Sequence, residues 1–524
     1  MNTGTLSTQP KLDHLIFWPS LFLILASSCL LILFPEASTQ FVEMLKVKIT
    51  YSLNWLYLSL TALALVFALW LAFGPYGHIK LGAKDAPPEY SNLHWIAMMF
   101  TAGIGSGLVI WGFAEPIFYL QTPPFGIEPF SQEAQEWAHM YPLFHWGILP
   151  WAVYVIPAVP IAYQLYVKDV KEMRISSSCD AALPQKGRGT IKWMMDVFII
   201  IGIVGGTVTA LGLGVPFISA LVAETFGVAD NDTAKLAILA IWTLLVSFSV
   251  ANGLKKGIKV LADINMILAV IAIIFILIAG PTLFILSMSV NSFGLMLDNF
   301  VKMSFWTDPI AKSGFPEDWT VFYWAWWFAF SAFVGLFIAR ISRGRTIKQL
   351  VLGVIGWGSL GTWLFLSVTG AYSLNLEITG QLPVSEILAE DGMSVLVAKI
   401  IATLPFSKVV LVLFIILGMV FAATNIDSAA YIIASICSKD IRNDQEPQLW
   451  TRLVWTVSFA LLTTGLVLVG ALQAVLAITV ICSVPLIPIL ILMCVSMLKW
   501  LKQHDETYGE GVPEIEISRT QQIN

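Results

Sequence analysis

Aromatic side chains crowd into the stretch VFYWAWWFAF (321–330), where seven of the ten residues are aromatic. At about 100° per residue of helix, Trp327 lies about 60° from Phe330, whereas Trp326 faces nearly away from Trp324. We therefore expect that Trp324 and Trp326 do not line the same cavity. One predicted helix face carries Trp327, Phe330, Ser331 and Val334.

A second aromatic cluster, FHWGILPWAVY (144–154), lies in a different predicted helix. Trp146, Trp151 and Tyr154 fall on one arc of a regular helix, although Gly147 and Pro150 can distort it. Two Trp-rich clusters favour an aromatic cage for a trimethylammonium group. Such a group has no N–H to donate, and ring faces attract it by about 0.5–2 kcal/mol each. Rings also cost far less than a carboxylate to bury in a membrane. The alternative is an interfacial aromatic belt combined with ordinary packing.

The run TAGIGSG (101–107) places Gly103, Gly105 and Gly107 inside one apolar stretch. Each glycine weakens a helix by about 1 kcal/mol relative to alanine. One interpretation is a broken membrane helix, whose unwound carbonyls bind a cation while its half-helix ends face a substrate. The other is close packing of two helices. A dinucleotide-binding loop is not expected, because no βαβ unit surrounds the run.

A polar run, AATNIDSA (422–429), interrupts another apolar stretch. Polar side chains at that depth are costly unless they pair or line a cavity. Thr424 and Asn425 offer neutral oxygens suited to a hard cation such as Na⁺, and hydrogen bonding between helices is the alternative. Glu115 is expected to be an interfacial charge at the outer end of its span.

The elements that must position these residues are membrane helices. The 524-residue chain is 57% hydrophobic and only 12% charged, with a mean hydropathy of +0.79. A soluble protein needs more charge to cover its surface, and apolar runs of about 20 residues recur along the chain. We therefore expect an all-α polytopic membrane protein with about twelve spans. They are predicted at 15–34, 51–74, 93–113, 141–167, 194–223, 234–252, 258–286, 320–342, 349–371, 407–437, 452–471 and 473–499. Short amphipathic segments are expected at 287–306 and 385–403.

The distribution of basic residues predicts the orientation of these spans. With the N-terminus inside, most of the 29 Lys and Arg residues fall in inner segments, notably 168–192, KKGIK (255–259) and ARISRGRT (339–346). The outer loop 114–140 contains no Lys or Arg. The positive-inside rule therefore places both termini in the cytoplasm, and residues 1–14 are expected to be a cytoplasmic tail, not a cleaved signal peptide.

Several classes of function are not expected from the composition. The five cysteines form no CxxC pattern, and the six histidines form no metal-binding spacing. The sequence shows no nucleophile–base pair, so an enzyme acting on choline-type headgroups is disfavoured. It shows no basic patch interleaved with aromatics, so nucleic acid is not an expected partner. No cofactor is expected apart from a coupling ion. A ligand-gated channel is the alternative to a transporter.

At these residues the chain resembles the betaine/carnitine/choline transporter family. The resemblance runs from about residue 15 to 500, and its most specific passages are FHWGILPWAVY, DPIAKSGFPEDWTVFYWAWW and FIARISRGRT. It implies a leucine-transporter-type fold of two inverted five-helix repeats and commonly a homotrimer. The expected divisions are a tail at 1–14, two peripheral helices within 15–92, repeats at 93–286 and 320–499, a connecting segment at 287–319 and a cytoplasmic tail at 500–524.

The resemblance also implies roles for individual residues. The central aromatic box for the quaternary ammonium corresponds to Trp146, Trp151, Tyr154 and Trp327. Trp324 and Trp326 correspond to an outer, transient site or its support. In sodium-coupled members a cation site joins carbonyls of the third span to oxygens of the tenth, and the matching positions are Thr101, Ile104, Phe421, Thr424 and Asn425.

Four positions depart from patterns within the family. Asn425 stands where sodium-coupled members carry serine, and Asn265 stands where sodium-independent carnitine exchangers carry an arginine. Phe330 replaces an outer-site tryptophan of betaine symporters, and Ser106 is neutral where choline carriers are thought to place an aspartate. The expected function is transport of a zwitterion such as carnitine, γ-butyrobetaine or glycine betaine across the bacterial inner membrane, coupled to Na⁺. The alternatives are ion-independent substrate:product exchange, carried out as antiport instead of symport, and choline uptake.

Overall fold

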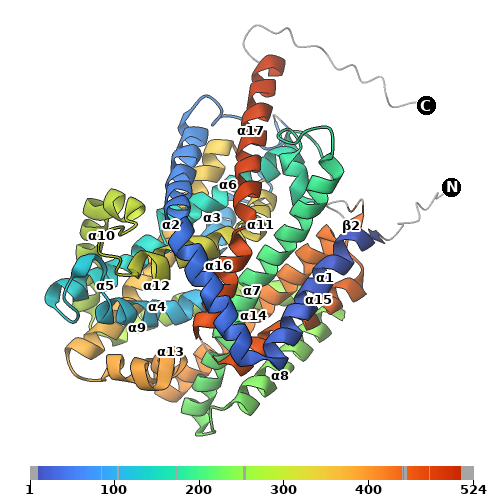
Figure 1. Cartoon of the computed structure of the whole chain (residues 1–524). Coiled ribbons are helices and arrows are strands. Elements are labelled where there is room, and N and C mark those ends of the chain that lie inside the picture. Colours follow the sequence, from blue (N-terminus) through green and yellow to red (C-terminus); the bar gives the residue numbers. More distant parts are fainter. Residues whose placement is uncertain are drawn as a thin grey trace.

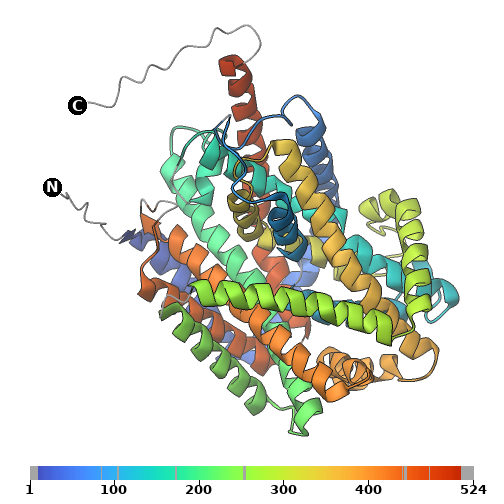
Figure 2. The same ribbon diagram turned by 180° about the vertical axis from the view of Figure 1, so that it is seen from behind.

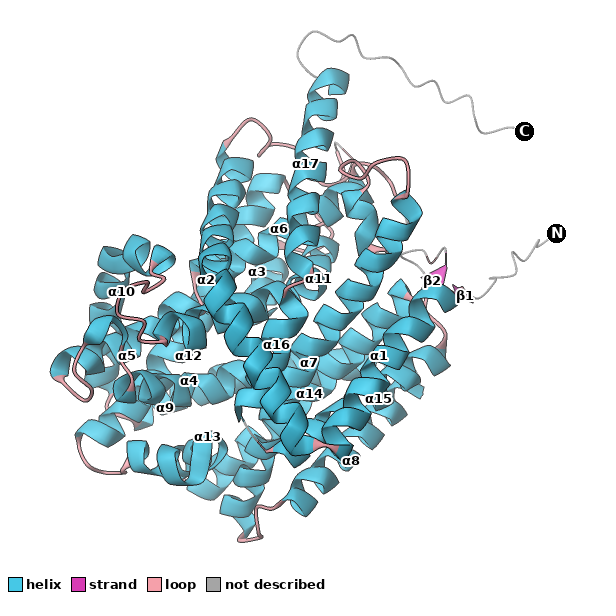
Figure 3. Ribbon diagram, in the orientation of Figure 1, coloured by secondary structure: helices cyan, strands magenta, loops and turns pink. Residues whose placement is uncertain are grey.

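The computed structural model describes residues 10–83, 85–102, 105–170, 174–251, 255–439, 441, 445–470 and 472–508. Nearly all of this part of the chain is helical (Figure 3). Among the described residues, eleven helices are long and apolar enough to cross a membrane. The chain is therefore an all-α polytopic membrane protein, as its composition predicts.

The N-terminal part contains the predicted peripheral helices and the predicted break. Helices α1 (His14–Leu33) and α2 (Pro35–Phe73) come first, and α2 begins well before the predicted start at residue 51. The predicted span 93–113 is two helices, α3 (Asn92–Ala102) and α4 (Ser106–Gln121). The break predicted at the glycine run is thus present, although α4 continues eight residues beyond the predicted end. The binding of a cation at the break stays a prediction.

The span predicted at 141–167 is also interrupted. Helix α5 (Gln132–His145) ends just before Gly147, and α6 (Ile148–Tyr166) begins just after it. A Cβ on Gly147 would lie 2.6 Å from the indole nitrogen of Trp363, so only glycine permits this close approach. The regular helix that we assumed across Trp146 and Trp151 is therefore wrong at residues 146 and 147.

The middle of the chain differs from the prediction in one element. Helices α7 (Arg188–Phe226) and α8 (Asp232–Ala251) match predicted spans, and α9 (Lys255–Ala279) ends earlier than expected. Helix α10 (Thr282–Phe305) was expected to be a short amphipathic segment, but it is long and apolar enough to be a candidate span. In Figure 2, α9 and α10 lie on the outside of the bundle and run at a steep angle to each other.

The C-terminal half follows the predicted order of helices. Helix α11 (Val321–Ile341) is preceded by one π-helical turn, and α12 (Ile347–Ile378), α13 (Val384–Ala402), α14 (Ser407–Ile436) and α15 (Leu449–Val469) follow. The last predicted span is divided into α16 (Leu472–Ser483) and α17 (Leu486–Tyr508). Helix α17 therefore extends into the predicted C-terminal tail. The division of the chain into two inverted repeats stays a prediction.

Helices α6 and α11 form the centre of the bundle (Figure 1). Both are apolar all round, and nearly every side chain on them is buried, which is typical of a helix enclosed by others. Helix α8, by contrast, has few fully buried side chains. The two aromatic clusters therefore lie largely in helices that other helices enclose.

The two ends of the described chain lie at the same end of the bundle. Strand β1 (Lys11–Leu12) pairs antiparallel with β2 (Ser438–Lys439), and Asp13 forms an ion pair with Arg174. Near the end of α17, the His504 ring lies 3.1 Å from the Tyr163 hydroxyl. This arrangement agrees with an even number of membrane crossings.

Candidate functional site

The two aromatic clusters line one cavity in the middle of the bundle. The cavity has a volume of about 120 Å³ and lies beside the break between α3 and α4. Side chains or backbone from α4, α6, α7, α11, α12 and α14 form its walls. Its lining residues are Gly105, Gly107, Leu108, Trp146, Pro150, Trp151, Tyr154, Ala210, Trp326, Trp327, Phe330, Phe333, Val334, Thr362 and Asn425.

The four residues of the predicted aromatic box all line this cavity, and Trp327 contacts both Trp146 and Tyr154. The ring of Trp327 lies 4.8 Å from that of Trp146 and 6.1 Å from that of Tyr154, both edge to face. Tyr154 in turn lies 5.6 Å from Trp151. Rings placed at steep angles to one another present faces toward a shared space, which suits a cation without hydrogen-bond donors.

Hydrogen bonds hold the box rings in place. The indole of Trp327 donates to the carbonyl of His145 at 3.0 Å, which joins α11 to the end of α5. The hydroxyl of Thr362 donates to the carbonyl of Trp146 at 2.7 Å and so joins α12 to the same break. The interruption between α5 and α6 therefore frees carbonyls that neighbouring helices use to fix the rings.

A buried carboxylate, Glu115 on α4, completes this support. Its Oε2 accepts from the indole of Trp146 at 3.0 Å and from the hydroxyl of Tyr323 at 2.7 Å. Its Oε1 accepts from the hydroxyl of Tyr119 at 2.6 Å and lies 3.2 Å from Nδ1 of His145. Glu115 has no exposed surface, so these contacts replace the water that a carboxylate otherwise needs.

Glu115 is the main residue that sequence reasoning misjudged. We expected an interfacial charge, because the span was predicted to end at residue 113. Helix α4 continues to Gln121 and carries Glu115 into the aromatic core. The sequence did contain a signal for a buried Glu115. This acidic residue lies in an apolar run, and no Lys or Arg stands near it in the sequence.

Trp324 and Trp326 do not line the same cavity, as predicted. Trp326 lines the cavity and stacks on Trp327 at 5.4 Å with nearly parallel planes. Trp324 lies outside it and packs against Phe144 and His145. The role of Trp324 and Trp326 in an outer site stays a prediction.

The predicted cavity face of α11 is correct at all but one position. Phe330 and Val334 line the cavity with Trp327. Ser331 does not, because it is fully buried and its hydroxyl donates to the carbonyl of Phe328. Phe333 and Thr362 line the cavity and were not predicted. Cavity residues of this kind depend on neighbouring helices, so helical spacing alone cannot identify them.

The predicted cation site lies only in part within the described residues. Ile104 and the side chains of Thr101 and Ser106 fall outside them. Asn425 lines the cavity, and its amide nitrogen would lie 4.0 Å from a Cβ added to Gly105. Helix α14 therefore approaches the break between α3 and α4. The broken helix and α14 are the two predicted spans, the third and the tenth, that were expected to form the cation site. The hydroxyl of Thr424 donates to the carbonyls of Val420 and Phe421 in its own helix.

The remaining charge of the α14 polar run is paired. Asp427 accepts from the guanidinium of Arg452 on α15 at 2.9 Å. Pairing between helices was one of the two interpretations of the run, and it applies at Asp427. The ligation of Na⁺ by Phe421, Thr424 and Asn425 stays a prediction.

The geometry of this site agrees with what the chain is similar to. The model of the betaine/carnitine/choline family transporters matches residues 15–506. The chain belongs to the betaine/carnitine/choline transporter family. It is a transporter and not an enzyme.

Two relatives with known names are similar to this chain over most of its length. A carnitine transporter of Acinetobacter baumannii is 32% identical over 468 residues, which cover 88% of this chain and 85% of the relative. A glycine betaine transporter of Acinetobacter baylyi is 34% identical over 517 residues, which cover 98% of this chain and 77% of the relative. Among solved structures, a substrate-bound, outward-open Na⁺-coupled sialic acid symporter matches with 13% identity, a TM-score of 0.41 and 80% coverage of both chains.

Proposed function

We propose that this family member carries a trimethylammonium zwitterion, such as carnitine, γ-butyrobetaine or glycine betaine, by alternating access around the aromatic cavity. The observation that carries the proposal is the meeting of Trp146, Trp151, Tyr154 and Trp327 in one cavity. Among the residues that the structure describes, no carboxylate lines this cavity, so the rings are the groups available to attract a cation there. The names of the two relatives support this substrate class.

The carboxylate end of a zwitterion also finds suitable groups. The first turn of α4 lies at the cavity through Gly105, Gly107 and Leu108, and Gly105 caps this helix without a side-chain hydrogen bond. Free N–H groups at a helix N-terminus favour an anion. The buried indole N–H of Trp326 has no hydrogen-bond partner among the described residues, so it is a further donor for the carboxylate. Choline has a neutral hydroxyl in place of the carboxylate and gains less from these donors.

We propose Na⁺ as the coupling ion, with ion-independent exchange as the second candidate. The proximity of Asn425 to Gly105 supports the first, because it brings a neutral amide group of α14 to the broken helix. The amide of Asn265 donates to the carbonyl of Leu417 at 3.2 Å, so the position that would carry an exchanger's arginine contacts α14, the helix of the predicted cation site.

The proposed membrane and orientation follow from the family and from the distribution of basic residues. We place the protein in the bacterial inner membrane as a multi-pass protein with both termini in the cytoplasm. The clustering of Arg174, Arg340 and Arg345 at the end of the bundle where the chain begins supports this orientation. We expect a homotrimer surrounded by membrane lipid.

Uptake into proteoliposomes tests the proposal. Labelled carnitine, glycine betaine and choline are each supplied with and without an inward Na⁺ gradient. The proposal predicts saturable uptake of at least one zwitterion, stimulated by Na⁺, with slower uptake of choline. Counterflow of labelled substrate separates a carrier from a channel, since a channel cannot accelerate exchange. Uptake of choline alone would contradict the proposed substrate class, and zwitterion exchange insensitive to Na⁺ would favour the exchanger.

A further inference from the structure

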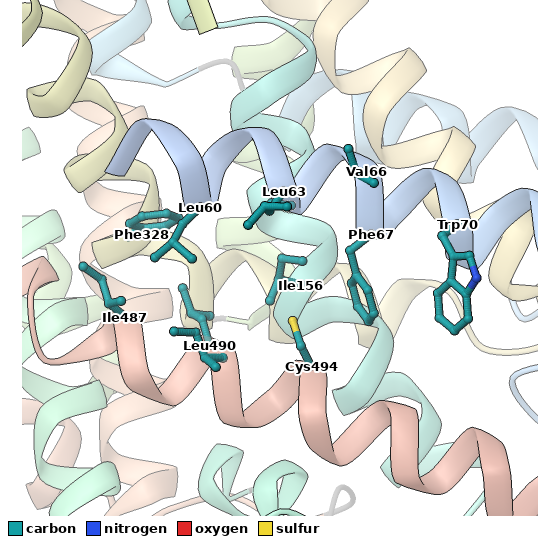
Figure 4. Close-up of a pocket in the computed structure, with 12 residues that line it drawn as sticks. Leu60, Leu63, Val66, Phe67, Trp70, Ile156, Phe328, Ile487, Leu490 and Cys494 are labelled. Carbon is teal, nitrogen blue, oxygen red and sulfur yellow. The ribbon is translucent and has the colours of Figure 1, made fainter. Parts of the chain in front are cut away.

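A second cavity, distinct from the aromatic one, lies between α2 and α17 on the outside of the bundle. It is an open groove of about 420 Å³. Figure 4 shows Leu60, Leu63 and Phe67 of α2 facing Ile487, Leu490 and Cys494 of α17, with Ile156 and Phe328 between the two helices. Every lining side chain is apolar apart from the indole N–H of Trp70 and the thiol of Cys494.

The groove is open on the side that faces away from the bundle. Leu63 and Val66 are 58% and 62% exposed at its rim, whereas Ile156 and Phe328 are 5% and 3% exposed at its floor. In a membrane protein such a rim faces the hydrocarbon of the bilayer. Water gains almost no hydrogen bonds in a groove of this composition, so hydrocarbon is the favoured occupant.

The length of the groove fits one leaflet. Its wall on α2 runs from Leu60 to Trp70, which is about 15 Å at a rise of 1.5 Å per residue. This is half of the roughly 30 Å hydrocarbon core of a bilayer. The acyl chain of a single phospholipid therefore matches the groove better than a helix from another protein, which needs about 20 residues to cross the core.

A cation lies near one end of the groove. Trp70 marks this end, and Phe73 follows one helical turn later. The ammonium of Lys348 lies over the ring of Phe73, 5.2 Å from its centre. Lys348 is exposed and has no carboxylate partner within the part of the chain that the structure describes. A tryptophan beside a lysine is typical of the level at which lipid headgroups lie.

We propose that the groove binds a phospholipid, with an acyl chain between α2 and α17 and its phosphate at Lys348. The floor residues connect this lipid to transport. Ile156 comes two residues after Tyr154 on α6, and Phe328 directly follows Trp327 on α11. The lipid and the substrate thus contact different faces of the same two helices. An occupied groove supports both helices from behind the aromatic box.

Photo-crosslinking tests this site. The protein is reconstituted with a phospholipid that carries a photoactivatable diazirine in one acyl chain, and adducts are mapped by mass spectrometry. Ala64→Phe fills the floor of the groove, where Ala64 is 5% exposed. Ala240→Phe makes the same change on the exposed face of α8, outside the groove, and is the matched control.

We expect adducts around Ile156 and Cys494 to exceed those on the exposed face of α8 several-fold. Ala64→Phe should remove most of them, and Ala240→Phe should not. Lys348→Gln should lower them, and because Lys348 is exposed this variant remains informative if Ala64→Phe does not fold. Equal labelling of the groove and of α8, or groove labelling unchanged in both Ala64→Phe and Lys348→Gln, would overturn the proposal. Crosslinks between two copies of the chain through the groove would also overturn it.

Discussion

In the proposed mode of binding, Trp327 is the residue on which recognition of the substrate depends most directly. It contacts both Trp146 and Tyr154, and its indole is fixed by the carbonyl of His145. A ring held in this way loses little entropy when a cation binds, since its orientation is already set. The desolvated position of Trp327 favours the upper part of the cation–π range, about 2 kcal/mol.

Replacing Trp327 with leucine should weaken substrate binding at least about tenfold, which is about 1.4 kcal/mol. The reason is the loss of the ring face that joins the two halves of the box. The measurement is substrate binding by isothermal titration calorimetry on purified protein. Trp455→Leu is the control, because Trp455 is fully buried on α15, outside the cavity. An unchanged affinity in Trp327→Leu would show that the rings serve packing alone.

We expect Glu115 to affect substrate binding through Trp146 and Tyr323, whose side chains donate hydrogen bonds to it. A carboxylate accepts hydrogen bonds at both oxygens, whereas the amide of glutamine places an NH₂ group opposite donors. Glu115→Gln should therefore misplace Trp146 or Tyr323 and weaken substrate binding several-fold, with the shape of the side chain retained. Binding and melting temperature are measured together, with the exposed Glu133→Gln as the control. A lower melting temperature with unchanged affinity would assign Glu115 a purely structural role.

At the scale of secondary structure, the candidate site is formed at two interruptions between helices. The break between α3 and α4 exposes the first turn of α4 to the cavity, and the break between α5 and α6 exposes the carbonyls that position the rings. Helix α14 reaches the first break at Asn425. Elements interrupted at membrane depth are tolerated where they line a cavity, and both interruptions do.

The proposed coupling to Na⁺ depends on the break between α3 and α4 and on α14, and it can be tested by substrate binding. Raising Na⁺ should lower the apparent Kd for the zwitterion, and the substrate should tighten Na⁺ binding by the same factor. Asn265→Arg should abolish this dependence while preserving exchange, because a fixed cation then faces α14. Affinities are compared in Na⁺ and in choline-free K⁺ buffer at one pH. Identical affinities in the two buffers would rule out sodium coupling in the wild-type protein.

The first break was predictable from the sequence, and the second was not. Three glycines in one span are a strong local signal, since each lowers helix stability. A single glycine at 147 gives a weak signal, and its reason lies in Trp363, more than 200 residues away. The same applies to Glu115, whose partners come from α5, α11 and its own helix. The two aromatic clusters and the family resemblance predicted the box residues, whereas packing between helices decided how they are held.

At the scale of the whole molecule, the described chain begins and ends on one side of the bundle. Regulation of transport through contact of the C-terminal segment with lipid headgroups would need clustered Lys and Arg residues there. After Lys499 this sequence has two further Lys and Arg residues, Lys502 and Arg519, among five acidic residues. This composition gives little attraction to an anionic membrane surface.

We therefore expect transport in proteoliposomes that does not rise steeply with external osmolality. Initial uptake rates are compared after addition of an impermeant solute, at constant Na⁺ and substrate concentrations. Liposomes whose lipids carry more negative charge should give the same flat response. A several-fold activation would show that osmotic stress regulates this chain by another route and would make protection against osmotic stress its main role.

The central claim is that the cavity recognises the positive charge of the substrate through its rings. The most direct test compares the binding of γ-butyrobetaine with that of 5,5-dimethylhexanoate, in which carbon replaces the quaternary nitrogen and the shape is kept. Cation–π attraction predicts that γ-butyrobetaine binds at least about tenfold more tightly, a difference of about 1.4 kcal/mol. Equal affinity of the two compounds would contradict the account, because apolar contact alone would then explain binding in the box.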